Sequence, residues 1–538
     1  MHEDAVELAL ADWRQAIGDD NVLGGEQAER RYGGGLTAPA RRRIIGAIKV
    51  RSTEYLAAIV RISSQHAIPL YPISTGRNWG YGGASPVRDG CAIVDLSSLD
   101  QILDFDAELG LVTVQPGVTQ RKLREYLDAH APEFLVPVHG GGPECSLLGN
   151  AIERGYGITP YADHFGALTS LEALLPNGEI YRPLLATMGG SLVDASFKWG
   201  VGPYLDGLFT QSNFGLVTQA TFALARAPQC IEAFYFWIND DRRLERSVVA
   251  VRETLRQVGG VTGMINLMDT RRVLSMLIPY PKHALGKGQV MPDEMVSALA
   301  RLQHAPAWMG VGALYGTARV VRAARKDVKR HLKAVADRLI FVSPNSLRRL
   351  RTLLRYLPWK RLEPIRTAVD TVYKAFDLMA GVPSQVALPL AYWKSAAKPI
   401  EAQTMDPGKD GCGLIWYSPL VPMKPDCVRK YVSMVNKTCV KHGIEPLITL
   451  TSISNGCFDS TVPLLFDRED LEEAARANAC YQALFDEGRK MGILPYRVGV
   501  QQMGLLADPQ APACRLAATL KHAIDPQGIM SPGRYSIS

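Results

Sequence analysis

Residues 71–84 read YPISTGRNWGYGGA, and this loop decides how the first half of the chain is interpreted. Apolar residues lead into a segment in which glycines surround polar side chains. Glycine allows positive φ angles and a close approach of the backbone to a ligand. Consecutive backbone N–H groups in such a turn can bind an anion such as a pyrophosphate. The loop matches neither the P-loop pattern nor G-x-G-x-x-G between a strand and a helix, so it does not indicate a Rossmann site.

Two further glycine-rich clusters follow the first. One runs from the GGGP of residues 140–143 into GNAIERGYGITPYADH at 149–164, and the other is GPYLDGLFTQSNFGLVT at 202–218. Between about residues 45 and 230, strand-like apolar runs alternate with short amphipathic segments, which is an α/β texture. Three such clusters in one α/β segment suit a long cofactor that lies extended against a sheet.

Short sequence patterns predict individual strands and a helix in this segment. The pattern changes after the segment. Strands are expected at residues 92–96, 110–114 and 215–218. Thr119 is expected to cap a helix on which Leu123, Tyr126 and Leu127 share one face. Beyond residue 231 helical periodicity is longer and glycine clusters are fewer, which indicates a second domain.

Composition excludes several classes of protein. The 538 residues exceed one ordinary core, and 47% apolar and 21% charged residues are typical of a globular protein. A net charge of +7 without any nucleic-acid-binding motif predicts no nucleic-acid partner. The chain lacks an apolar run long enough to cross a membrane, and its start is acidic, unlike a secretory signal. Nine scattered cysteines indicate neither disulfides nor a metal site, so a cytoplasmic protein is expected.

A basic segment lies between Arg319 and Arg361. Its leucines are spaced for one helix face, which favours a surface helix with its apolar side in the core. The alternative is a docking face for an acidic redox partner or an anionic membrane. The leucines concerned are Leu347, Leu350, Leu353, Leu354 and Leu357.

The three clusters, together with the ending DPQGIMSPGR at 525–534, resemble the motifs of the vanillyl-alcohol oxidase / 4-cresol methylhydroxylase family of FAD enzymes. The resemblance covers nearly all of residues 45–230 and the C-terminal stretch, and is looser between them. It implies an α+β fold, with a PCMH-type FAD-binding domain of two subdomains and an α/β cap domain that shapes the substrate pocket. The implied divisions are a helical lead-in at 1–44, the FAD-binding domain at 45–230, the cap at 231–485 and a returning segment at 486–538.

The resemblance also implies a set of residues that contact FAD. Most belong to the first glycine loop and the others to the later motifs. They are Ser74, Gly76, Arg77, Asn78, Gly80, Gly82, Gly83, Gly149, Asn150, Gly215, Val217 and Arg534.

Family members that act on 4-substituted phenols hold the phenol oxygen with two tyrosines and an arginine, which match Tyr81, Tyr496 and Arg497. A guanidinium and two hydroxyls would lower the pKa of the phenol. A hydride could then pass from the side chain to flavin N5, leaving a quinone methide that gives an alcohol, aldehyde or alkene. Arg534 would stabilise charge on the reduced ring. The resemblance further implies oxygen or a cytochrome as electron acceptor, and a homodimer.

Two positions depart from the family pattern. Val138 stands where alcohol-oxidising members carry an aspartate, so that role is lost or moved to His139 or Glu144. Ile158 replaces a family tyrosine and predicts a more apolar pocket wall. These departures favour an alternative substrate, a non-phenolic alcohol, a hydroxy acid or a natural-product intermediate.

Covalent attachment of FAD through histidine is not expected. The loop DGCGLIWYSP at 410–419, where some relatives attach FAD, contains no histidine, nor does the Gly76 loop. Attachment through a tyrosine stays open, with Tyr417 as the candidate. A third hypothesis is a flavin-binding electron-transfer subunit without a reaction of its own, supported only by the basic residues from Arg348 to Arg361.

Overall fold

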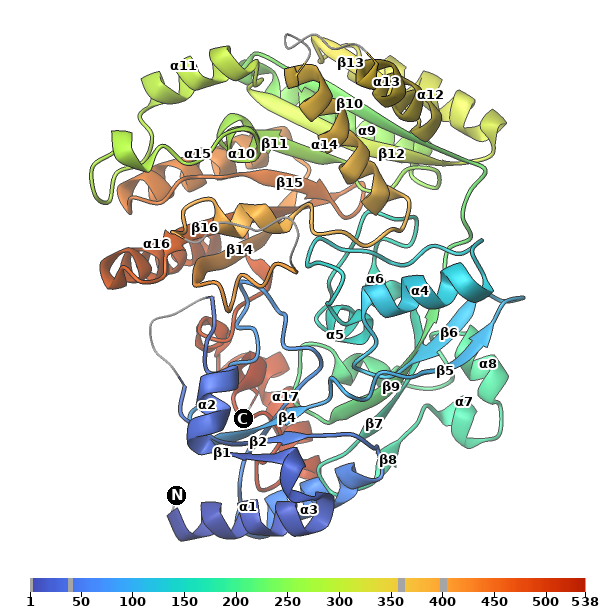
Figure 1. Ribbon diagram of the computed structural model, residues 1–538, viewed down its shortest axis with the longest axis vertical. Helices are drawn as coiled ribbons and strands as arrows, with labels where there is room; N and C mark the ends of the chain where they lie inside the picture. The colour runs from blue at the N-terminus through green and yellow to red at the C-terminus, as the bar shows by residue number, and fades with distance from the viewer. Residues whose placement is uncertain (1–2, 37–41, 357–362, 397–403, 538) are drawn as a thin grey trace.

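The computed structural model describes residues 3–36, 42–356, 363–396 and 404–537. Two units are stacked along the long axis of the molecule (Figure 1). The lower unit contains the N-terminal part of the chain and receives its last part, drawn in red. The upper unit, called the cap below, is built around one large sheet. Helices and separate sheets therefore combine in the predicted α+β arrangement.

The first sheet of the lower unit has four strands in the order β1-β2-β4-β3. β2, β4 and β3 are parallel, and β1 is antiparallel to β2. Every residue of β4 is buried, as expected for a strand covered on both faces. The strands are β1 (Val22–Gly24), β2 (Ile44–Lys49), β3 (Leu70–Ile73) and β4 (Cys91–Asp95). The helices of this subdomain are α1 (Glu3–Ile17), α2 (Gly25–Tyr32) and α3 (Tyr55–His66). The lead-in predicted for residues 1–44 holds α1 and α2, and its β1 also extends the sheet.

The second sheet of the lower unit is antiparallel, with strands in the order β5-β6-β9-β7-β8. Thr119 caps α4 as predicted, since its hydroxyl accepts the backbone N–H of Lys122 at 3.1 Å. The strands are β5 (Ile102–Asp106), β6 (Leu111–Val114), β7 (Leu168–Leu174), β8 (Ile180–Tyr181) and β9 (Leu216–Ala223). The helices are α4 (Gln120–His130), α5 (Leu147–Ile152), α6 (His164–Ala167), α7 (Leu184–Thr187) and α8 (Ser191–Ser196).

The cap contains an antiparallel sheet of eight strands, in the order β13-β10-β12-β11-β15-β16-β14-β17. Side chains of β10 alternate between its two faces: Phe234 and Phe236 join one core cluster, whereas Ala233 and Tyr235 join another. The strands are β10 (Cys230–Ile238), β11 (Asn266–Asp269), β12 (Trp308–Gly316), β13 (Arg338–Val342), β14 (Cys412–Pro422), β15 (Thr449–Ser452), β16 (Cys457–Asp467) and β17 (Pro495–Arg497).

Helices cover the cap sheet on both faces. α9, α12, α15 and α16 contribute to the core cluster under Phe234, and α13 and α14 to the cluster under Tyr235. The cap helices are α9 (Leu244–Val258), α10 (Thr270–Leu277), α11 (Asp293–Gln303), α12 (Ala318–Leu332), α13 (Pro344–Arg355), α14 (Glu363–Met379), α15 (Pro425–Lys441) and α16 (Leu471–Lys490).

The C-terminal segment joins the cap before it returns to the lower unit. The division predicted after residue 485 falls inside α16, and β17 pairs with β14 so that Arg497 lies opposite Ser418. The chain then reaches the first sheet, where the N–H of Leu70 donates to the carbonyl of Ile529 at 2.7 Å. Helix α17 (Pro512–Ile524) precedes that contact. One segment therefore ties the cap to the lower unit.

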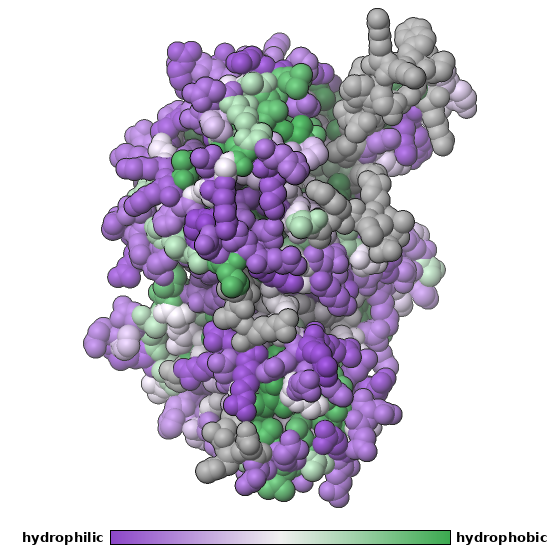
Figure 2. Space-filling view, turned by 60° about the vertical axis from the view of Figure 1, so that its left-hand side comes forward, coloured by the Kyte–Doolittle hydropathy of each residue, from purple (hydrophilic) through white to green (hydrophobic). Residues whose placement is uncertain are grey.

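The basic segment of the cap is two helices, α12 and α13, separated by β13. Of the leucines expected on one buried face, Leu347 and Leu354 are buried, whereas Leu350 and Leu353 are 40% and 57% exposed. Leu357 and Arg361 lie outside the described residues. Figure 2 shows one face of the molecule, covered mainly by hydrophilic residues with scattered hydrophobic patches. None of the helices in the described ranges is long and apolar enough to span a membrane.

Candidate active site

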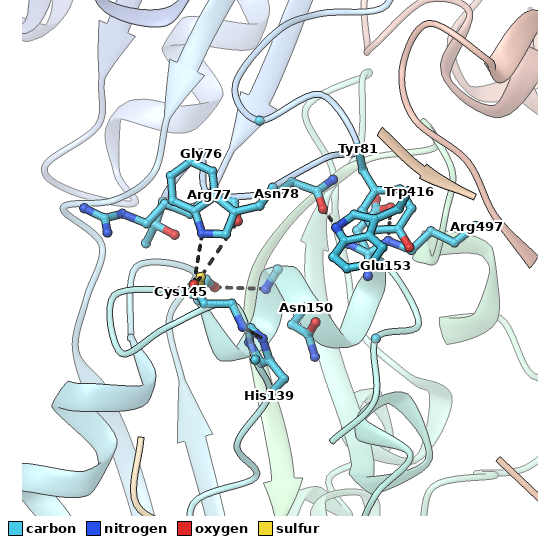
Figure 3. A pocket seen from close by; sticks show the side chains of 18 of the residues that line it. Gly76, Arg77, Asn78, Tyr81, His139, Cys145, Asn150, Glu153, Trp416 and Arg497 are labelled. Atoms are coloured by element: carbon cyan, nitrogen blue, oxygen red, sulfur yellow. Dashed lines mark hydrogen bonds and ion pairs between the residues drawn. The ribbon is translucent and has the colours of Figure 1, made fainter. Parts of the chain in front are cut away.

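A cavity of about 370 Å³ lies where the lower unit meets the cap. The lower unit contributes the loop after β3, the loop before α5 and α5 itself, and the cap contributes α10, β14, β16 and β17. In Figure 3, Tyr81, Glu153, Trp416 and Arg497 gather at one end of this cavity. Cys145 and His139 lie on the other side of the view, and Asn150 lies between the two groups. Its volume is typical of a site for a small molecule or part of a cofactor.

The glycines of the first loop divide into two groups. Gly76 and Gly83 line the cavity with φ angles of 67° and 61°, a backbone that only glycine adopts readily. Gly80 and Gly82 do not line it. A side chain on Gly80 would collide with Trp416, and one on Gly82 with Val500. Two of the four predicted loop glycines therefore serve to pack the loop against the cap and the C-terminal segment.

The other predicted FAD contacts lie along one continuous path. Ser74, Arg77, Asn78, Gly149 and Asn150 line the main cavity. Gly215 and Val217 line a smaller cavity of about 80 Å³ that shares Ser74 and Arg534 with the main one. A ligand that fills both would lie extended along the lower unit.

Glu153 is the centre of a buried charge cluster that sequence reasoning missed. Its carboxylate forms an ion pair with Arg534, lies 3.9 Å from the Nε of Arg497, and accepts a hydrogen bond from the hydroxyl of Tyr535 at 3.0 Å. Arg534 also donates to the hydroxyl of Tyr71 at 2.6 Å. Two guanidiniums share one carboxylate, so this cluster has a net positive charge. Glu153 belongs to the GNAIERG motif, but nothing in the sequence distinguished its role.

The three residues predicted to hold a phenol all line the cavity. Arg497 stacks over the ring of Tyr81, with 4.2 Å from its guanidinium carbon to the ring centroid, and donates to the side-chain oxygen of Asn78 at 2.5 Å. The Tyr81 hydroxyl lies 2.7 Å from the hydroxyl of Ser418. Burial raises the pKa of Tyr81 to about 12 and also raises that of Tyr496. Both tyrosines are therefore neutral donors beside a permanent cation.

Asp459 is a second residue that the sequence did not reveal. It lies on β16, lines the cavity, and accepts a hydrogen bond from the hydroxyl of Tyr156 at 2.6 Å. Burial raises the pKa of Asp459 to about 7, although Tyr156 and Arg497 oppose the shift. A carboxyl that titrates near neutrality in a cavity is suited to proton transfer.

Neither position 138 nor its neighbours His139 and Glu144 provide an anion in place of the family aspartate. Val138 is fully buried in the core of the lower unit. Glu144 forms an ion pair with Arg121 and is absent from the cavity wall, so it does not take that role. His139 lines the cavity, and burial, with His164 and Arg497 nearby, lowers its pKa to about 3. It is therefore a neutral imidazole, not a substitute anion.

Two sequence-based expectations were wrong. Ile158 does not line the cavity, because it packs between the lower unit and the cap, where its carbonyl accepts the Tyr315 hydroxyl at 2.8 Å. Tyr417 is fully buried in the cap core, and its hydroxyl donates to the carbonyl of Leu484 at 2.9 Å. Its ring therefore cannot reach a flavin, and Tyr417 is not an attachment point.

The cavity fits a large ligand with polar edges. Three buried polar atoms on its wall have no hydrogen-bond partner in the described ranges: Nε2 of His139, Nε of Arg497 and Oδ1 of Asp459. Such atoms are costly unless a ligand or water completes them. Glycines at the wall leave room for a ring system, and the net positive charge suits an electron-accepting ring. The residues present therefore fit the flavin end of FAD.

Comparison with known proteins supports this assignment. A family model described as "FAD binding domain" matches residues 45–183. The 1'-carboxy-chondrochloren decarboxylase of Chondromyces crocatus is 36% identical over 99% of this chain and 98% of its own length. The 4-cresol dehydrogenase [hydroxylating] flavoprotein subunit of Pseudomonas putida is 28% identical over 98% of this chain and 95% of its own. The crystal structure of p-cresol methylhydroxylase with bound substrate has a TM-score of 0.87 and 27% identity, covering 100% of this chain and 98% of that one.

The fold and the site define an FAD-dependent oxidoreductase with a PCMH-type FAD-binding domain. The chain belongs to the vanillyl-alcohol oxidase / 4-cresol methylhydroxylase family.

Proposed function

We propose that this enzyme oxidises the side chain of a 4-substituted phenol. The observation that carries the proposal is the meeting of Tyr81, Tyr496 and Arg497 in one cavity, where Arg497 belongs to a charge cluster with a net positive charge. A phenolate would supply the missing negative charge. A buried cation paired in this way stabilises the phenolate over the phenol, which lowers the pKa of the substrate.

The residues proposed to hold FAD follow the path described above. Ser74, Gly76 and Gly83 would hold FAD in the main cavity, and Gly215 and Val217 would hold it in the smaller one. Bound FAD supplies an acceptor for the hydride that leaves the carbon attached to the phenol ring. Arg534 would offset negative charge that arises on that acceptor.

The protein's own residues would direct the remaining steps. Arg497 and the two tyrosine hydroxyls hold the phenolate oxygen, which pushes electrons toward the para carbon. Loss of the hydride leaves a quinone methide. Asp459, ionised above about pH 7, would take a proton from an attacking water to give an alcohol, or from the next side-chain carbon to give an alkene.

The proposal is tested with the double variant Tyr496→Phe, Arg497→Ala. It should keep its flavin but reduce it with 4-ethylphenol at least a hundredfold more slowly than the unmodified enzyme, as followed anaerobically by flavin absorbance. Tyr356→Phe is a suitable control because Tyr356 is 80% exposed on the cap. Unchanged reduction in the double variant would remove the proposal.

A second candidate function is oxidation of a carboxylated natural-product intermediate with loss of CO₂. The name of the 36% identical relative, a decarboxylase acting on a carboxy compound, favours it. After hydride loss, the bond between the carboxyl carbon and the side-chain carbon next to the benzylic one would break. Its electron pair would form the new C=C bond, the ring would return to a phenolate, and CO₂ would leave. The two electrons of the hydride would pass through the cofactor to oxygen or a cytochrome.

Three further properties stay predictions: the acceptor, oxygen or a cytochrome; a homodimeric state; and a cytoplasmic location. The 28% identical relative is named as a flavoprotein subunit, which is compatible with a partner protein as acceptor. Oxygen consumption during turnover separates the two acceptors, and light scattering gives the oligomeric state.

A further inference from the structure

Arg272 is a charged cavity residue that the chemistry described above does not use. It lies on α10 of the cap and lines the same cavity as Arg497 and Asp459. Its guanidinium donates to the hydroxyl of Ser275 at 3.1 Å, a neutral partner. Within the described ranges, no carboxylate lies within ion-pairing distance of it.

The neighbouring Arg271 differs from Arg272 because carboxylates pair with its guanidinium. Arg271 forms ion pairs with Glu445 and Asp293, each at 2.8 Å. Asp269, which caps α10, accepts the backbone N–H groups of Arg272 and Ile448 rather than a guanidinium. Asp269 attracts the Arg272 guanidinium electrostatically but lies beyond ion-pairing distance, so Arg272, which lines the cavity, has no ion-pair partner in the described ranges.

Apolar side chains of the cap contribute to the cavity wall on which Arg272 lies. The cap wall also includes Leu388, Leu390, Leu414 and Trp416. In such a setting a bare guanidinium is costly, and an anion that pairs with it bidentately binds strongly. Burial also lowers the pKa of Arg272 to about 10, which leaves it charged at neutral pH. Arg497, by contrast, already has Glu153, Asn78 and the face of Tyr81 around it.

We propose that Arg272 binds a carboxylate on the side chain of the substrate, so that the enzyme's substrate is a 4-hydroxyphenyl compound with an acidic tail. This inference rests on the proposed function, because it takes the phenol end to be held at Arg497. The two guanidiniums then bind the two ends of a dianion, and both come from the cap, Arg497 from β17 and Arg272 from α10. The cap thereby selects for the acid over neutral 4-alkylphenols.

The test compares 4-hydroxycinnamate with 4-hydroxycinnamamide, which differ in charge but little in size and carry no saturated benzylic carbon to oxidise. Their dissociation constants are measured on the FAD-loaded enzyme by calorimetry. The unmodified enzyme should bind the acid at least tenfold more tightly than the amide. Arg272→Gln should remove this preference while changing amide affinity less than twofold. If the glutamine variant does not fold, the same preference is measured with Arg272→Met, which keeps an aliphatic side chain of similar length.

Arg256→Gln is the matched control, because Arg256 is a cap arginine with a 53% exposed side chain. It should leave the preference intact. The inference is overturned if the unmodified enzyme shows no preference for the acid, if the preference survives in the Arg272 variants, or if they weaken both ligands equally. Loss of flavin from those variants would also overturn it, since Arg272 would then serve the cofactor.

Failure of this inference differs from failure of the proposed function. If 4-ethylphenol reduces the flavin but acid and amide bind equally, the phenol chemistry stands and the carboxylate site falls. If no 4-substituted phenol reduces the flavin, the proposed function falls whatever the binding preference.

Discussion

At the scale of single residues, charge balance explains the site. Arg497 and Arg534 share Glu153, so one guanidinium charge is left for a substrate or a reduced ring. Removing one member of a buried ion pair leaves an uncompensated charge, which is more costly than the pair is stabilising. Glu153 is therefore central to both the stability and the electrostatics of the cavity.

Glu153→Gln should lower the free energy of unfolding by about 3 kcal/mol, because Arg534 would lose its buried anion. Chemical denaturation of the flavin-loaded protein measures this loss. Glu487→Gln serves as control, since Glu487 pairs with Lys490 on the surface and should change stability little. Equal losses in the two variants would contradict the role given to Glu153.

The raised pKa of Asp459 leads us to expect that turnover depends on pH. Its pKa is raised from 3.8 to about 7, so it is protonated below that pH and becomes a base above it. If Asp459 accepts a proton during turnover, kcat/KM, which reports ionisations of the free enzyme, should rise as pH increases through about 7, and Asp459→Asn should remove that rise. The same shift means that the folded state binds the proton more tightly than the unfolded one. The carboxyl therefore contributes least to stability above pH 7. A rise that persists in the asparagine variant would assign the proton transfer elsewhere.

At the scale of elements, the loop after β3 and the strand pair β14–β17 position the site together. Arg497 enters the cavity from β17, whose partner β14 supplies Trp416 and Ser418. Because Gly80 and Gly82 lack side chains, the loop after β3 can lie close against Trp416 and Val500. The site thus depends on close packing between segments far apart in the chain.

Gly80→Ala should reduce kcat/KM at least tenfold, because its methyl group would displace Trp416 at the cavity wall. Gly178→Ala is the matched control: its φ angle of 87° gives a similar backbone strain, but nothing lies within 4 Å of its added carbon. Measuring kcat/KM for both variants distinguishes the effect of the collision with Trp416 from the effect of backbone strain at a positive φ angle. Equal effects would show that the φ angle alone matters.

Elements with local signals could be predicted from the sequence, and those set by tertiary packing could not. The strands at β4, β6 and β9, the cap at Thr119 and the glycine loops carry their signals within a few residues. The resemblance implied an α/β cap, but the individual strands of its sheet were not located, because long amphipathic helices separate most of them in the sequence. Asp459 and Glu153 were missed because the burial that gives them their roles comes from residues far away in sequence. Tyr417 and Ile158 were misplaced because motif spacing does not say which way a side chain points.

At the scale of the whole molecule, two units enclose one cavity, and a single C-terminal segment serves both. Tyr496 and Arg497 come from the cap sheet, whereas Arg534, further along the same segment, lies beside the first sheet of the lower unit. The same segment therefore supplies cavity residues from the cap and from the lower unit.

The flavin is expected to be held without a covalent bond, because Tyr417 is buried away from the cavity, and residues 410–419, most of which form β14 and not the expected loop, contain no histidine. Precipitating the protein with acid should leave the yellow colour in the supernatant. Colour that stays with the pellet would indicate a covalent link from another residue of the cavity.

The most direct test of the central claim is an anaerobic titration of the flavin-loaded enzyme with 4-ethylphenol and, separately, with its O-methyl ether. A site that works by holding a phenolate should bleach the flavin absorbance with one equivalent of the phenol and leave it unchanged with the ether, which cannot ionise. Bleaching by the ether at a comparable rate, or by simple alcohols or hydroxy acids but not the phenol, would contradict the account.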